Sequence, residues 1–268
     1  MAGNVSPWRR AVCGNLTSAF DFRDPDARVP NLPDTSGYAP PDRTTHPSYV
    51  PLPPASQAVP KQESGLRPAR ALPYELFAYD RVDASTGKFK LTFANTGSAG
   101  AAFQVQAANR IDGPWAYTVE ARRRLSDSWS TVATLGLYDL SVYGPNCFLC
   151  QFRGSTSAGD GRTPNPEALN PEALYGYDVI NGNLTLRLSN RGRTPPVRLT
   201  VSNAYSGATR SVELFPGQRL DEYVDLRGSH GWYDLTVSDG TTAGFLRRFA
   251  GHVETGRAST SDPAIATL

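Results

Sequence analysis

The sequence predicts an all-β protein that consists of two tandem small antiparallel β-sandwich domains preceded by a proline-rich extended arm. The 268 residues include 24 glycines, 22 prolines and one methionine, a balance that favours strands and turns over helices. Several short segments alternate apolar and polar residues, which is the period-two pattern of a half-buried strand. The same succession of segments occurs twice, so we expect two copies of one domain.

The duplication is recognised from segments that agree in order, spacing and chemistry. The matched pairs are 76–80 (LFAYD) with 174–178 (LYGYD), 88–95 (KFKLTFAN) with 183–190 (NLTLRLSN), 136–142 (GLYDLSV) with 231–237 (GWYDLTV), and 148–154 (FLCQFRG) with 245–251 (FLRRFAG). An Asn-x-Gly turn follows the second segment of each copy. These turns lie 95 residues apart, as do the Tyr-Asp-Leu segments, and such agreement is not expected by chance.

Each copy is predicted to form six or seven short strands, and the last hairpin is expected to turn at 144–146 and at 238–240. Leu137 and Trp232 are expected to pack into the core. Residues 24–73 hold 12 of the 22 prolines, which favours an extended or disordered arm. The predicted organisation is a segment 1–22 that is typical of a piece of another core, an arm 23–71, a first repeat 72–154, a linker 155–171, a second repeat 172–257 and a tail 258–268.

The charge pattern excludes some partners. A net charge of +2 does not predict a nucleic-acid partner. The clusters Arg122–Arg124 and Arg247–Arg248 have acidic neighbours, and we expect both on solvated strand faces. No stretch approaches the ~18 consecutive apolar residues that a membrane span needs. The N-terminus shows no apolar core of an export signal, so we expect none and leave the localisation unassigned.

Three cysteines are too few for a disulfide scaffold. Cys147 and Cys150 have C-x-x-C spacing, but the second pair that a zinc site needs is absent. We therefore expect these two to be small buried hydrophobic residues, with Cys13 left over. In the second copy, Gly244 and Arg247 occupy their positions, which suggests a looser final hairpin in the first copy.

Candidate catalytic groups are sparse. The histidines His46, His230 and His252 are scattered along the chain, and we expect them at the surface rather than around a metal. The duplicated pairs Tyr138-Asp139 and Tyr233-Asp234 could supply a base or a ligand. Their repetition on alternating strand positions favours a structural role, in which the Tyr is buried with its hydroxyl satisfied and the Asp faces a turn or solvent.

Four tyrosines offer an alternative to a purely structural interpretation: Tyr74, Tyr79, Tyr175 and Tyr177. They could form an aromatic platform for a ligand, but core filling at the sheet edge is the stronger hypothesis. No phosphate-binding loop, dinucleotide motif or nucleophile elbow occurs. We therefore assign no catalytic residue, no cofactor-binding residue and no metal ligand, and we expect no cofactor.

The blocks 136–146 (GLYDLSVYGPN), 230–237 (HGWYDLTV) and 244–257 (GFLRRFAGHVETGR) resemble the duplicated C-terminal domains of bacterial phosphocholine-type phospholipase C, in its haemolytic and non-haemolytic forms. The opening segment 5–22 (VSPWRRAVCGNLTSAFDF) resembles the stretch where the catalytic domain of that family ends. The resemblance covers nearly the whole chain. It implies a fragment whose catalytic domain, an alkaline-phosphatase-like α/β unit, lies before residue 1, so no catalytic residue transfers to this sequence.

Two hypotheses for function follow. The resemblance implies a non-catalytic accessory region of an exported phospholipase that hydrolyses phosphatidylcholine-type lipids, inactive by itself. Its expected partner is the catalytic domain, in the same chain or from an adjacent gene, and a phospholipid surface is a further candidate. The alternative is a free-standing β-sandwich module that binds a lipid headgroup, a carbohydrate or a protein. A phosphatase-like reading frame directly upstream would favour the first hypothesis.

Overall fold

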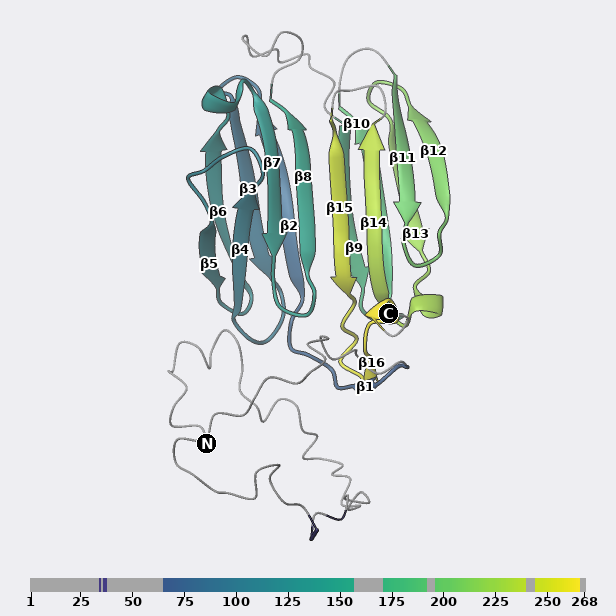
Figure 1. Ribbon diagram of the computed structural model, residues 1–268. Helices are drawn as coiled ribbons and strands as arrows, with labels where there is room; N and C mark the ends of the chain where they lie inside the picture. The colour runs from purple at the N-terminus through teal and green to yellow at the C-terminus, as the bar shows by residue number, and fades with distance from the viewer. Residues whose placement is uncertain are drawn as a thin grey trace, which may run out of the picture.

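The structure is a computed structural model that describes residues 34, 36–37, 65–156, 171–191, 196–239 and 244–265. Two β-sandwiches stand side by side, the first in blue and teal and the second in green and yellow (Figure 1). The predicted fold class is thereby confirmed. The predicted segment 1–22, most of the arm and most of the linker lie outside the described residues.

Each repeat contributes seven strands within the described part of the chain. The first repeat contains β2 (Leu76–Asp83), β3 (Lys88–Asn95), β4 (Ala101–Ala107), β5 (Trp115–Val119), β6 (Arg123–Ser130), the 3-10 turn η3 (Val132–Thr134), β7 (Leu137–Tyr143) and β8 (Leu149–Ser155). The second contains β9 (Pro171–Asp178), β10 (Asn183–Asn190), β11 (Val197–Asn203), β12 (Thr209–Leu214), β13 (Arg219–Val224), η4 (Arg227–Ser229), β14 (Trp232–Asp239) and β15 (Leu246–His252).

The central strands follow the alternation that the sequence shows. On β3, the side chains of Phe89, Leu91 and Phe93 are fully buried while Lys88 and Lys90 are exposed. On β10, the leucines at 184, 186 and 188 are buried in the same way. Because successive side chains point to opposite faces of a strand, this pattern places one face of each three-stranded sheet in the core.

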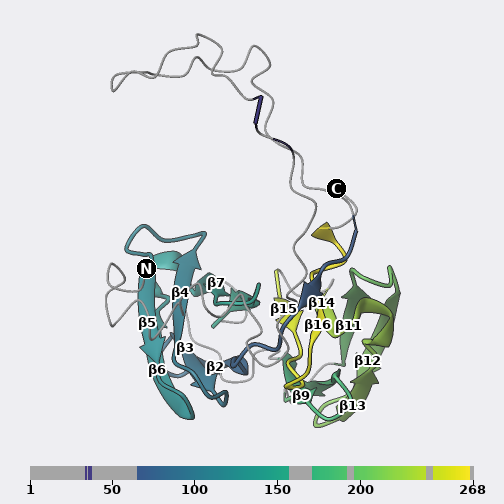
Figure 2. The same ribbon diagram turned by 90° about the horizontal axis from the view of Figure 1, so that it is seen from below.

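The two sandwiches share a sheet. The strand order β12-β11-β14-β15-β8-β7-β4-β5 forms one eight-stranded sheet, in which β15 of the second repeat pairs antiparallel with β8 of the first. The other layer consists of two separate three-stranded sheets, β2-β3-β6 and β13-β10-β9. Seen from below, β2 and β9 are the strands of this layer that face the other repeat (Figure 2). The repeats are therefore joined by backbone hydrogen bonds in one layer and by side chains in the other.

The pairing of β8 with β15 relates the repeats by a pseudo-twofold axis. Gln151 and Arg248 are directly opposite each other, and they hold equivalent positions in the aligned segments 148–154 and 245–251. A contact made by one repeat across the junction therefore has a counterpart made by the other repeat.

The strand register corrects one predicted match. Asp80 is paired with Leu91, and Tyr175 is paired with Leu186. Since Leu91 and Leu186 are equivalent, the counterpart of Asp80 is Tyr175, and the alignment of 76–80 with 174–178 is wrong by three residues. A shift by an odd number exchanges the two faces of a strand, so the error concerns which side chains point inward.

Two further expectations change. Leu137 is half exposed. Trp232 is buried on the outer face of the large sheet, against the C-terminal segment (residues 253–265), instead of lying in the core. The hairpin between β7 and β8 does turn at 144–148, as predicted. In the second repeat, Ser238 and Asp239 still belong to β14, and Gly240 lies outside the described residues.

The end of the arm meets the tail. Pro68–Ala69 (β1) pairs antiparallel with Ser259–Thr260 (β16) at the lower end of the molecule in Figure 1. The last residues of the predicted arm therefore form a short strand pair. Among the described residues, no helix has both the length and the apolar character that crossing a membrane requires.

Candidate functional site

A buried ion pair links the repeats. Nη2 of Arg247 on β15 lies 2.7 Å from Oδ2 of Asp80 on β2, and the side chains are 1% and 9% exposed. The same nitrogen donates to the hydroxyl of Tyr138 at 2.8 Å, and Nη1 donates to the carbonyl of Arg153. Burial, the largest influence, by itself would lower the pKa of Arg247, but the negative charge of Asp80 acting together with Tyr138 and the hydrogen bonds to both residues outweighs it and raises that pKa. The guanidinium therefore stays charged inside the junction.

The counterpart of this pair is neutral. Cys150 on β8 occupies the position equivalent to Arg247, and its Sγ lies 3.4 Å from the hydroxyl of Tyr175, the counterpart of Asp80. Burial raises the pKa of the Cys150 thiol to about 12. One half of the junction thus holds opposite charges, and the other half holds a thiol and a phenol.

Aromatic rings fill the space between the charged and neutral halves. The Tyr177 hydroxyl lies 2.8 Å from the carbonyl oxygen of Leu76 and 2.7 Å from the hydroxyl of Tyr233. The ring of Phe77 lies 4.6 Å from that of Tyr177 and stacks on Tyr79 at 5.5 Å. The four tyrosines considered as a ligand platform all pack against the core, which favours the core-filling hypothesis: Tyr74, Tyr79, Tyr175 and Tyr177.

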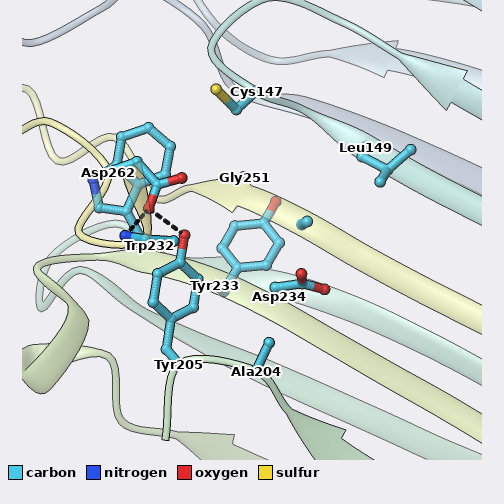
Figure 3. A pocket seen from close by; sticks show the side chains of 11 residues that line it. Cys147, Leu149, Ala204, Tyr205, Trp232, Tyr233, Asp234, Gly251 and Asp262 are labelled. Carbon is cyan, nitrogen blue, oxygen red and sulfur yellow. Dashed lines mark hydrogen bonds between the residues drawn. The ribbon is translucent and has the colours of Figure 1, made fainter. Parts of the chain in front are cut away.

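A pocket opens on the outer face of the large sheet beside this junction (Figure 3). It lies where β14, β15 and the start of β8 meet the C-terminal segment, and its volume is about 200 Å³. Small-molecule sites usually have ~300–1,000 Å³, so this pocket fits a small group only. Its lining includes Leu149, Tyr205, Trp232, Asp234 and Asp262.

The carboxylates of the pocket are already committed to neighbours. Asp262 accepts the Tyr205 hydroxyl at 2.7 Å and the amide of Ala264 at 2.8 Å. Asp234 accepts two hydrogen bonds from Arg248, at 2.8 and 2.6 Å. The pocket can hold a small, partly apolar group, but the described contacts leave neither carboxylate poised as a general base.

Cys147 is the pocket residue that sequence reasoning placed incorrectly. It lies in the turn between β7 and β8 at φ 57°, and it is exposed instead of buried. Gly244, its counterpart, also has a positive φ. Although the residue is exposed, partial desolvation of its thiol, with Asp262 nearby, raises the pKa of Cys147, which disfavours the reactive thiolate. The hairpin of the second copy lies partly outside the described residues, so the comparison of hairpin looseness stays a prediction.

The two histidines within the described range, His230 and His252, lie beside Ser259, where the C-terminal part of the chain packs against the second repeat. His230 caps η4 in the left-handed region. His252 was expected at the surface, but its side chain is buried. Its Nδ1 lies 3.0 Å from Glu254 and its Nε2 lies 3.1 Å from Ser259. Glu254 also accepts the amide of Leu72, so this network joins the start of the first repeat to the tail. Among the described residues, no three His, Cys, Asp or Glu side chains gather as a metal site, and His46 lies outside them.

The duplicated Tyr-Asp pairs have the structural role that the sequence favours. Tyr138 is buried and accepts a hydrogen bond from Arg247, while Tyr233 is buried and bonds to Tyr177. Asp234 faces outward to Arg248. Each tyrosine also lies opposite a glycine of the next strand, as in the pairing of Tyr138 with Gly154.

Sequence reasoning missed Arg247 and Asp80. The pair Arg247–Arg248 was expected on a solvated face; this is wrong for Arg247, while Arg122–Arg124 are exposed as predicted. The alternation of β15 contained the signal, because Arg247 falls on the same face as Phe249. The partner was hidden by the match of 76–80 to the wrong register.

A comparison with models of known protein families shows which family the chain is related to. The model of the family "Bacterial phospholipase C, C-terminal domain" matches residues 68–155 and again 171–252, one match for each sandwich. The chain belongs to this family. The two matches together cover more than half of the chain and fall on the two structural repeats.

Three curated relatives of the chain are named phospholipase C. The chain is 73% identical over 267 residues to a non-hemolytic phospholipase C of Burkholderia pseudomallei, with 99% of this chain and 37% of the relative covered. Two Pseudomonas aeruginosa proteins follow: a non-hemolytic phospholipase C (47% identity, 99% and 38% covered) and a hemolytic phospholipase C (38% identity, 98% and 39% covered). The chain thus spans less than two fifths of the length of these relatives.

Proposed function

We propose that this chain is a non-catalytic accessory module of a bacterial phospholipase C, and that another part of such an enzyme hydrolyses the phosphodiester of phosphatidylcholine-type lipids. The observation that supports this most is the double match to the phospholipase C C-terminal domain family, one match for each sandwich. Within these sandwiches, the candidate tyrosine Tyr138 bonds to Arg247 of the other repeat, and the candidate Asp234 pairs with Arg248 of its own repeat.

The junction favours a rigid module. The ion pair, the aromatic rings and the pairing of β8 with β15 join the repeats into one unit. The network around Glu254 links the start of the first repeat, at Leu72, to the end of the second. A module built in this way can hold a partner domain in a fixed orientation, whereas two sandwiches that move independently cannot.

An exchange experiment tests the accessory role. The matched segment of the Burkholderia relative is replaced by this chain, and release of phosphocholine from phosphatidylcholine is measured. We expect the chimera to hydrolyse the lipid, and we expect the isolated chain to give no turnover with any divalent metal. Metal-dependent turnover by the isolated chain, lost on substitution of one of its residues, would contradict the proposal.

A further inference from the structure

One end of the first repeat exposes large apolar side chains on neighbouring loops. Ile111 lies in the loop between β4 and β5, Val132 and Leu135 lie in and after η3, and Leu137 begins β7. Their exposed fractions are 102%, 74%, 68% and 50%. Most large apolar residues of the sandwich are buried, so four such residues at one end are a feature to explain.

Hydrogen bonds hold these loops together. Arg110 donates to the carbonyl of Ser130 at 2.6 Å, and Asn109 donates to the carbonyl of Leu137 at 3.2 Å. Thr131 donates its amide and its hydroxyl to the carbonyl of Gly87 in the turn between β2 and β3. The tips thus form one group, which we call the apolar tip, at the upper end of the first repeat in Figure 1.

The second repeat is an internal comparison for the apolar tip. Its η4 adopts the same backbone, with His230 at φ 56° where Leu135 has φ 54°. At the position of Val132 it has Arg227, and at that of Leu137 it has Trp232, which the C-terminal segment covers. The fold therefore does not require apolar residues at positions 132 and 135. A leucine in the left-handed region is even unfavourable, since Asn and Gly adopt it more readily.

Basic side chains flank the tip. Lys88 follows the turn directly, and Lys90 and Arg81 lie opposite each other on the outer face of the adjoining sheet, all three exposed. The second repeat has lost these charges, because Asn183, Thr185 and Gly176 occupy the equivalent positions.

The acidic residues at this end are engaged locally. Asp112 pairs with Arg110, and Asp83 accepts hydrogen bonds from Ser85 and Thr86. These hydrogen bonds lower the pKa of Asp83, so its carboxylate keeps its negative charge opposite Lys88. The three exposed cations Lys88, Lys90 and Arg81 outnumber it, so the net charge beside the apolar tip is positive, and the second repeat lacks these three cations.

We propose that the apolar tip of the first repeat inserts into the surface of an anionic phospholipid bilayer, with Lys88, Lys90 and Arg81 contacting the headgroups. This inference rests on the proposed function, since it gives the accessory module the task of placing an enzyme on its lipid. Protruding apolar side chains beside positive charge fit the interface of a membrane, where apolar burial and attraction to anionic lipid add.

Vesicle binding of the whole chain tests the proposal. The probes are vesicles of phosphatidylcholine alone and of phosphatidylcholine mixed with phosphatidylglycerol, and bound protein is measured by co-sedimentation. The tip variant combines Ile111→Ser, Val132→Ser and Leu135→Asn; asparagine tolerates the left-handed backbone at 135. The matched control is Ile180→Ser, which changes an equally apolar, 79% exposed residue in the hairpin between β9 and β10. That hairpin contacts the η4 end through Asn183 and Leu226.

We expect the wild type to bind the anionic vesicles more tightly than the neutral ones, the tip variant to bind them at least tenfold less, and Ile180→Ser to bind as the wild type does. A Lys88→Gln, Lys90→Gln variant should lose the preference for anionic lipid, which keeps the proposal testable if the tip variant misfolds. Absence of vesicle binding, or equal binding by wild type and tip variant, would overturn it. Loss of association with the remaining part of the Burkholderia relative, with vesicle binding unchanged, would assign the tip to a protein partner instead. None of these measurements uses phosphodiester hydrolysis. The membrane proposal can therefore fail while the proposed accessory function holds, and the two failures can be told apart.

Discussion

The guanidinium of Arg247 in the second repeat lies 2.7 Å from the carboxylate of Asp80 in the first, and water reaches almost none of either side chain. The guanidinium also lies over the ring of Phe245, whose centroid is 4.5 Å from the Arg247 Cζ. Removal of one member of such a pair leaves the other as an uncompensated buried charge.

Arg247→Ala should therefore lower the free energy of unfolding by about 3–5 kcal/mol. The neighbouring Arg248→Ala is the matched control: its side chain is 41% exposed and pairs with Asp234, so its loss should be below about 1 kcal/mol. Urea denaturation measures both. The combination Arg247→Met with Asp80→Leu should recover most of the stability, because no charge is then left buried. Equal stability of the two single arginine variants would refute the role assigned to the pair.

The stability of the protein should fall in alkaline solution partly because of Cys150. Its thiol has a pKa of about 12 in the folded protein and 9.0 as an ordinary thiol. The folded state therefore retains a proton that the unfolded state releases, and this contribution is complete below pH 9 and is lost as the pH rises toward 12. Cys150→Ala should show a shallower loss of unfolding free energy between pH 8 and pH 10.5 than the wild type. Below pH 8 the two curves should run parallel, and parallel curves over the whole range would contradict the assignment.

Gly154 should not tolerate a side chain. A Cβ atom there would lie 2.4 Å from the Tyr138 hydroxyl oxygen and 2.8 Å from its Cζ. Gly154→Ala should thus cost about 1–3 kcal/mol, the usual range for overpacking. Gly228→Ala is the control, since nothing lies within 4 Å of its added Cβ. Thermal unfolding compares the two, and similar melting temperatures would show that the Tyr138 ring can move aside.

The C-terminal segment should protect Trp232. The indole N–H donates to the carbonyl of Thr260 at 3.0 Å, and Asp262 accepts the hydroxyl of Tyr205. Truncation after Gly256 removes both partners, so the emission of Trp232 should shift to longer wavelength and become accessible to acrylamide. The same truncation in a Trp232→Phe background isolates this tryptophan from the others. The emission of Trp232 is the difference between the spectra of the protein with Trp232 and with Trp232→Phe. If this difference is the same before and after the truncation, the segment does not cover the ring.

Much of the fold followed from the sequence because it depends on local patterns. Alternation identified β3 and β10, and the two Asn-x-Gly turns gave the offset of the repeats correctly. Leu140, Val142, Leu235 and Val237 are in the core as their spacing requires. These features need only the period of a strand and the chemistry of a turn.

The junction could not be derived in the same way. The pairing of β8 with β15 joins segments about a hundred residues apart, and nothing local distinguishes it from an open edge. Arg247 and Arg248 have the same chemistry, yet the pleat buries one and exposes the other. The five-residue similarity between 76–80 and 174–178 was strong enough to suggest a false register, which concealed the partner of Arg247.

The two unequal halves of the junction also decide which copies can associate. Two first repeats placed face to face across the pseudo-twofold axis would set Asp80 of each against Cys150 of the other, with no cation for either carboxylate. Two second repeats would set Arg247 against Tyr175, with no anion for either guanidinium. Each homotypic pairing would bury unpaired charge, whereas the pairing within one chain satisfies every charge. The unequal halves of the junction thus favour association of the two repeats of one chain over association of either repeat with the same repeat of another molecule.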